Sequence, residues 1–197
     1  MSKFHHTLSS RKLSRREKRY YYKLSATASI MTSIKNELIG TWKLLSYIEV
    51  PIEGDDSLFP MGKNPYGILM YSSDGYMAVQ ISKEGRLLYK SNDKMMATQE
   101  EMASSLQGYI AFSGKYKIDN NNAVVTYSIE SSLFPNWKNQ MQHRRIDFEG
   151  DVLYLKSTEP ILSNGVYVNS YMTWQRMGRS VDDFVDEHLL KEITLKN

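Results

Sequence analysis

The chain has 197 residues, of which 41% are hydrophobic and 24% are charged, and it contains no cysteine. These values suit one globular domain with appendages, and the lack of cysteine excludes disulfide bonds and thiolate metal sites. It also fits a reducing compartment, so we expect a cytoplasmic protein. No apolar run approaches the roughly 18 residues of a membrane-spanning helix, so no membrane span is expected.

The formal net charge of +3 is unevenly distributed. Residues 1–30 hold eight basic side chains and one acidic side chain, so the remainder is mildly acidic. We expect residues 1–32 to be a basic, disordered tail, either native or the product of a start codon upstream of Met31. Its composition is also similar to that of a transit peptide or a basic arm for an anionic surface. Nucleic acid is not expected as a partner of the folded domain, since only this tail would suit it.

The folded domain is expected to span residues 33–178. Residues 40–50 alternate apolar and polar side chains, which predicts a half-buried strand. The inward face is predicted to be Trp42, Leu44, Ile48 and Val50, and the outward face Lys43, Tyr47 and Glu49. Residues 67–81 predict a hairpin, because Ser-Ser-Asp-Gly supplies a turn whose glycine can take a positive φ.

A helix is predicted after the hairpin, because Thr98 and Glu101 match a capping box. Met102, Leu106 and Tyr109 would form its apolar stripe. Five further strands are predicted at residues 108–119, 122–130, 140–148, 151–156 and 166–176. Eight short strands at this spacing are typical of a barrel or a sandwich. Residues 179–197 are predicted to form a C-terminal amphipathic helix that docks on the barrel.

The strand predicted at 140–148 places polar side chains in phase with its core residues. Since alternate residues share a face and Ile146 sets the inward phase, Gln142 and Arg144 are expected inside. Tyr127 is expected inside from the preceding strand. An enclosed arginine is tolerated if a carboxylate meets it or if the interior is a wet or ligand-filled cavity. An eight-stranded barrel is wide enough to enclose one small ligand.

The predicted ligand-binding residues are therefore Tyr127, Trp137, Gln142 and Arg144. Arg144 would offer a cationic fork to a carboxylate, enolate or carbonyl group, and Trp137 would form part of the rim. In the alternative register, Arg144 faces outward and pairs with a surface acid. No histidine pair has metal-ligand spacing, and neither a phosphate-binding glycine loop nor a serine-hydrolase elbow occurs. We therefore expect no metal and no cofactor, and catalytic residues remain unknown.

Several motifs resemble those of a known family. Gly40-Thr41-Trp42 resembles the G-x-W that opens lipocalin barrels, and Arg176 resembles the closing arginine that stacks on this tryptophan. From Leu38 to about Arg176 the chain is similar to the lipocalin-like domain family of small bacterial and fungal cytoplasmic proteins. The matching stretches are LIGTWKLLSY, FPMGKNPYGILMYSSDGYMAVQ, the T-x-E-E helix start, YIAFSGKYKID, SLFPNW and the Q-x-R of residues 142–144.

This resemblance implies an all-β fold, namely a closed eight-stranded antiparallel barrel with one inserted helix and, after it, the C-terminal helix. We expect the barrel to bind a small hydrophobic or amphipathic molecule with an anionic or carbonyl group. The alternative is an isomerase or cyclase of a biosynthetic pathway that needs no cofactor, as some relatives imply. The sequence offers no convincing general base for it. A homodimer is left open.

Overall fold

The computed structural model describes residues 34–54 and 56–178. The basic tail predicted at 1–32 and the C-terminal helix predicted at 179–197 lie outside the described residues. Within the described ranges, no helix is long and apolar enough to cross a membrane.

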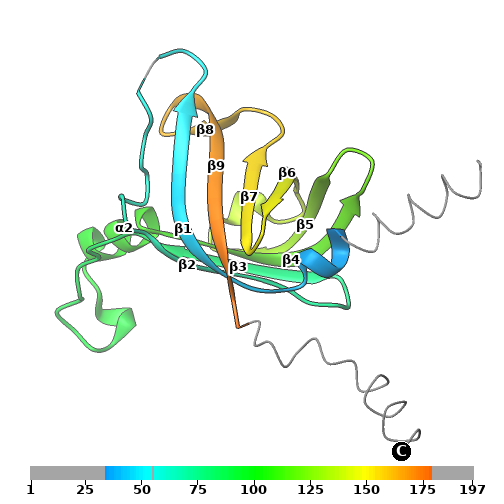
Figure 1. Cartoon of the computed structure of the whole chain (residues 1–197). Helices are drawn as coiled ribbons and strands as arrows, with labels where there is room; N and C mark the ends of the chain where they lie inside the picture. The colour runs from blue at the N-terminus through cyan, green and yellow to red at the C-terminus, as the bar shows by residue number, and fades with distance from the viewer. Residues whose placement is uncertain (1–33, 55, 179–197) are drawn as a thin grey trace, which may run out of the picture.

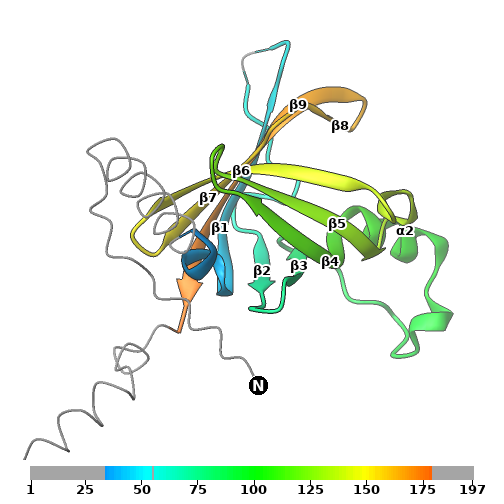
Figure 2. The same ribbon diagram turned by 90° about the vertical axis from the view of Figure 1, so that its right-hand side faces the viewer.

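Eight antiparallel strands close into a barrel (Figures 1 and 2). Neighbouring strands pair in chain order, and β9 completes the circle by pairing with both β7 and β1. The predicted closed antiparallel barrel is confirmed. Its strands are β1 (Gly40–Pro51), β2 (Tyr66–Tyr71), β3 (Tyr76–Ser82), β4 (Tyr109–Asp119), β5 (Val124–Ser132), β6 (Met141–Glu149), β7 (Val152–Ser157) and β9 (Val166–Met177).

One further strand, β8 (Ile161–Ser163), was not predicted from the sequence. It pairs with the first residues of β9, beyond the stretch of β9 that pairs with β7. Three residues are too few to show an alternating pattern. The turn that follows does carry a signal, because Asn164 and Gly165 both take positive φ, as a two-residue hairpin turn requires.

The helices lie mainly at the two ends of the barrel. The inserted helix α2 (Gln99–Gln107) begins at Thr98, whose hydroxyl and backbone form the expected capping box with Glu101. Its stripe residues Met102 and Leu106 remain half exposed. Both views place α2 and a helical segment at residues 34–38 at opposite ends of the barrel. Two short 3-10 helices complete the structure, η1 (Lys94–Met96) and η2 (Pro135–Trp137).

The predicted face assignment of β1 is wrong in its second half. A β-bulge at residues 44–46 inserts one residue opposite β9, so the side chains beyond it exchange faces. Tyr47 and Glu49, predicted to face solvent, are therefore buried inside the barrel, whereas Ile48 and Val50 lose their predicted inward positions to them. This bulge turns a carboxylate into the barrel interior.

The barrel end nearest residues 34–38 is closed by Trp42 and Arg176. The guanidinium carbon of Arg176 lies 4.1 Å from the centroid of the indole ring, as the lipocalin resemblance implied. The indole Nε1 donates a hydrogen bond to the carbonyl of Leu38 at 2.9 Å. Arg176 donates to the carbonyl of Ile39 at 3.0 Å and pairs with Asp151 at 3.5 Å. From β9, the arginine thus joins residues 37–39, the turn between β6 and β7, and Trp42 of β1.

We expect Arg176→Met to lower the free energy of unfolding by about 2–3 kcal/mol, because it removes the cation over Trp42 and leaves half-buried carbonyl groups without donors. Urea denaturation followed by tryptophan fluorescence measures this change. The matched control is Lys115→Met, since Lys115 pairs with Glu130 at 3.9 Å and both side chains are more than half exposed. The control should change stability by no more than about 0.5 kcal/mol. Equal effects of the two substitutions would contradict the closing role.

Candidate functional site

A cavity of about 1080 Å³ lies inside the barrel and opens toward the α2 end. Its volume slightly exceeds the usual range of ligand pockets, which is roughly 300–1,000 Å³. Most of its wall is apolar, and the inner part is formed by Met61, Leu69, Met77, Val79, Ile81, Leu155 and Trp174. Gln107, at the end of α2, and Phe134 lie at its mouth. The described residues contain no cluster of acidic or histidine side chains suited to hold a metal ion.

Arg144 projects from β6 into this cavity and is 8% exposed. The neighbouring Ile146 is buried as well, while His143 and Arg145 are exposed, so the predicted inward phase of β6 is confirmed. The alternative register, with Arg144 on the outer surface, is thereby wrong. Alternation along the strand was sufficient to place this side chain, because apolar residues follow it in phase.

The guanidinium of Arg144 is incompletely satisfied. Nη1 donates to the carbonyl of His143 at 3.0 Å, and Nη2 donates to Oε1 of Gln142 at 3.0 Å. The Nε hydrogen is buried without an acceptor. In residues 34–54 and 56–178, no carboxylate lies within 4.0 Å of this guanidinium. Burial consequently lowers the pKa of Arg144, because the charged form is removed from water.

Three buried phenols lie within electrostatic reach of Arg144. The hydroxyl groups of Tyr71 and Tyr127 share a short hydrogen bond, and their ring centroids are 6.2 Å apart. Burial raises the pKa of Tyr127 to about 12 and also raises the pKa values of Tyr71 and Tyr47. The positive charge of Arg144 opposes each of these rises. The phenols therefore stay neutral near pH 7 and do not supply a counter-charge.

Sequence reasoning missed Glu49, which the β1 bulge turns into the cavity. Its Oε1 accepts a hydrogen bond from the Tyr47 hydroxyl at 2.6 Å, and its Oε2 accepts one from Oγ of Ser163 at 2.7 Å. Ser163 belongs to β8, the strand that was also missed. The sequence does contain one sign of the bulge, because the adjacent Leu44 and Leu45 interrupt the alternation of apolar and polar residues in β1.

The remaining predicted site residues lie on the same cavity. Trp137 in η2 is half-buried, and its ring packs edge-on against Phe112 at 5.7 Å and against Phe134 at 5.6 Å. Gln142 is half-buried beside Arg144. The structure thus brings together all four residues predicted for ligand binding, from β5, η2 and β6.

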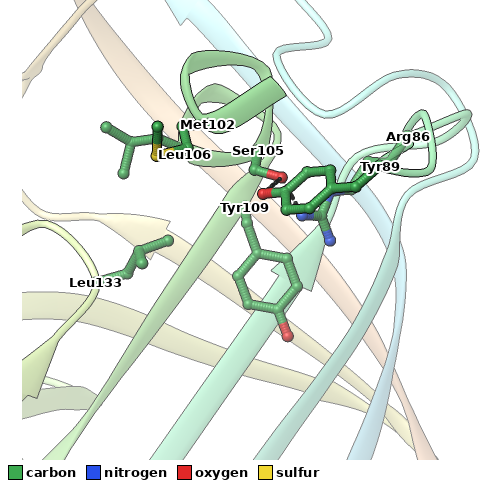
Figure 3. A pocket seen from close by; sticks show the side chains of 7 residues that line it. All are labelled: Arg86, Tyr89, Met102, Ser105, Leu106, Tyr109 and Leu133. Atoms are coloured by element: carbon green, nitrogen blue, oxygen red, sulfur yellow. Dashed lines mark hydrogen bonds between the residues drawn. The ribbon is translucent and has the colours of Figure 1, made fainter. Parts of the chain in front are cut away.

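A second hollow of about 490 Å³ lies on the outer surface beside α2 (Figure 3). Its polar groups already satisfy one another, because Tyr89 and Arg86 donate to Oγ of Ser105 at 2.7 and 3.1 Å. Arg86 also lies over the ring of Tyr109, 5.0 Å from its centroid. Its apolar wall consists of Met102, Leu106 and Leu133. The barrel cavity, which has unmet hydrogen-bonding groups, is the better candidate site.

Comparisons with known proteins agree with the barrel. The model of a family described as a lipocalin-like domain matches residues 39–177. The 4'-hydroxy-3'-methoxypropiophenone carrier protein of Aspergillus oryzae is 28% identical over 109 residues, which cover 52% of this chain and 98% of that protein. A solved structure of an uncharacterized protein from Bacteroides eggerthii has 11% identity and a TM-score of 0.34, over 71% of this chain and 99% of that chain.

Between pH 10 and pH 12, we expect the free energy of unfolding to fall less steeply in Tyr127→Phe than in the wild-type protein. Burial raises the pKa of Tyr127 from 10.0 to about 12, so in this range the unfolded chain loses a proton that the folded chain keeps. The contribution of the phenol is complete below pH 10 and is lost as the pH rises toward 12. Between these values, the substitution should reduce the fall in the free energy of unfolding by up to about 1.4 kcal/mol per pH unit.

Urea denaturation across this pH range and near neutrality separates this effect from the lost hydrogen bond to Tyr71. The lost hydrogen bond should lower stability by about 1 kcal/mol at neutral pH. An identical pH dependence in both proteins would show that Tyr127 titrates normally in the folded state.

Proposed function

Because this chain belongs to the lipocalin-like domain family, we propose that its barrel binds a small, largely apolar molecule that presents a carbonyl or anionic oxygen to Arg144. The observation that carries this proposal is the enclosed guanidinium. It has a buried N–H without an acceptor and, in the described part of the chain, no carboxylate within ion-pair distance. A buried charge in this state costs several kcal/mol, and an oxygen atom from a ligand would reduce that cost.

The groups next to Arg144 support the same ligand chemistry. Oε1 of Gln142 accepts from Arg144, so the amide NH2 of Gln142 remains available as a second donor. Tyr127 adds a neutral phenol from the neighbouring strand, where it pairs with Gln142 across the ladder. This end of the cavity is therefore rich in donors, and its natural partner is an acceptor oxygen. Trp137 and Phe112 provide an aromatic wall for the body of the ligand.

The relative from Aspergillus oryzae is named as a carrier of 4'-hydroxy-3'-methoxypropiophenone, which is an aryl ketone. A ketone oxygen is an acceptor of the kind that Arg144 and Gln142 would bind. We therefore propose aromatic ketones, and aromatic carboxylates of similar size, as the first ligand classes to test. The alternative of a cofactor-independent isomerase or cyclase stays a prediction. Tyr127 gives it no support, because a phenol with a pKa near 12 is a poor general base at neutral pH.

We expect Arg144→Met to weaken binding of 2-acetylnaphthalene and 2-naphthoate by at least about tenfold, since each loses a charge-assisted hydrogen bond. The melting temperature of the free protein should stay equal or rise, because an incompletely paired buried charge is replaced by an apolar side chain of similar length. Isothermal titration calorimetry measures the affinities, and calorimetric melting measures the stability.

The matched control is Arg145→Met, which makes the same substitution at the adjacent, exposed position of β6. It should change neither affinity nor melting temperature. Unchanged affinity in Arg144→Met would refute the assignment of Arg144. A parallel loss of affinity and stability would instead indicate a structural arginine.

A further inference from the structure

A second buried charge faces the same cavity. Glu49 is 3% exposed and projects from β1 beyond the bulge. Its carboxylate accepts hydrogen bonds from Tyr47 and Ser163, one on each oxygen. Among the described residues, no lysine, arginine or histidine nitrogen lies within 4.0 Å of it. Glu49 therefore resembles Arg144, since each is buried and, among the described residues, has no oppositely charged group within 4.0 Å.

The carboxylate retains unused capacity to accept hydrogen bonds. An ionised carboxylate has about four acceptor positions, and the two donors fill two of them. Enclosed polar groups that lack partners are unfavourable, so additional donors at this position would be stabilising. The chemistry required here is opposite to that at Arg144, because Glu49 needs donors and Arg144 needs acceptors.

Tyr47 lies within electrostatic reach of both charges. Its hydroxyl donates to Glu49, while the positive charge of Arg144 acts on the same phenol. A ligand cation bound at Glu49 would share the low-dielectric cavity with this arginine and would be repelled by it. A neutral hydroxyl group meets the carboxylate without that repulsion.

We propose that Glu49 forms a second subsite, which selects apolar ligands that carry a hydroxyl group at the end opposite to their carbonyl oxygen. This inference rests on the proposed function, because it assumes that the carbonyl end is bound at Arg144. The ligand class is thereby narrowed from apolar molecules with an oxygen acceptor to hydroxylated ketones, such as phenolic aryl ketones.

The carboxylate of Glu49 also stabilises the fold, and the test must separate this structural role from the proposed role in ligand binding. Through Ser163, Glu49 ties β1 to β8, which pairs only with the beginning of β9 among the described strands. Ser163→Ala removes this tie and leaves the carboxylate in place. Glu49→Gln removes the charge and keeps the size of the side chain and one acceptor oxygen.

The experiment uses the full-length chain and three fluorescent probes, namely 2-acetylnaphthalene, its 6-hydroxy derivative and its 6-methoxy derivative. The wild-type protein should bind the hydroxy probe at least about tenfold more tightly than the methoxy probe, because a hydrogen bond to a buried charge is lost in the ether. In Glu49→Gln, this preference should fall below about threefold, while the affinity for 2-acetylnaphthalene should stay unchanged. Ser163→Ala should retain the preference.

The outcomes distinguish this inference from the proposed function. Equal wild-type affinities for the hydroxy and methoxy probes overturn the second subsite, while binding of 2-acetylnaphthalene still supports the first. Failure of all three probes to bind overturns the proposed function and the inference with it. If Glu49→Gln and Ser163→Ala both melt at lower temperature and lose affinity for all three probes alike, Glu49 is a structural tie and the inference is wrong.

Discussion

The proposed binding site depends on one constraint, which is the burial of the Arg144 guanidinium. This group is enclosed in an apolar barrel, and one of its N–H groups has no acceptor. A charge removed from water requires either a counter-charge or several hydrogen bonds. The neighbouring phenols cannot provide the counter-charge, because burial raises their pKa values and keeps them neutral. The missing hydrogen-bond acceptor must therefore come from elsewhere, and Arg144 lines a cavity large enough for a small molecule.

The two buried arginines of the barrel show how differently one side chain can be treated. Arg176 at the closed end contacts an indole ring, backbone carbonyls and the carboxylates of Glu37 and Asp151. Its two carboxylate neighbours, each at 3.5 Å, supply the counter-charge that a buried structural arginine needs. Arg144, at a similar degree of burial, is held by one carbonyl and one amide. This contrast is the reason to regard one as part of the scaffold and the other as part of a site.

The sequence predicted those features that depend on local alternation. The phase of β6 could be inferred because Ile146 follows Arg144 in step, and the start of α2 because Thr98 and Glu101 form a capping box. Features that depend on pairing between distant strands could not be inferred. The bulge in β1 is defined by its register against β9, so Glu49 was assigned to the wrong face. The short β8 exists because β9 supplies its partner, and the cavity volume depends on how the whole barrel closes.

The bulge at residues 44–46 has a consequence for how such a barrel can change over evolutionary time. β1 pairs with β9 on both sides of the bulge, Leu44 with Trp174 and Ser46 with Thr173. A single residue gained or lost there would be taken up locally, so the side chains that follow it in β1 would keep their partners and their faces. Trp42 precedes the bulge, so its packing against Arg176 would stay in place. One codon inserted or deleted at this position would therefore leave Tyr47 and Glu49 inside the barrel, so the bulge is a place where the length of β1 can change without altering the lining of the cavity.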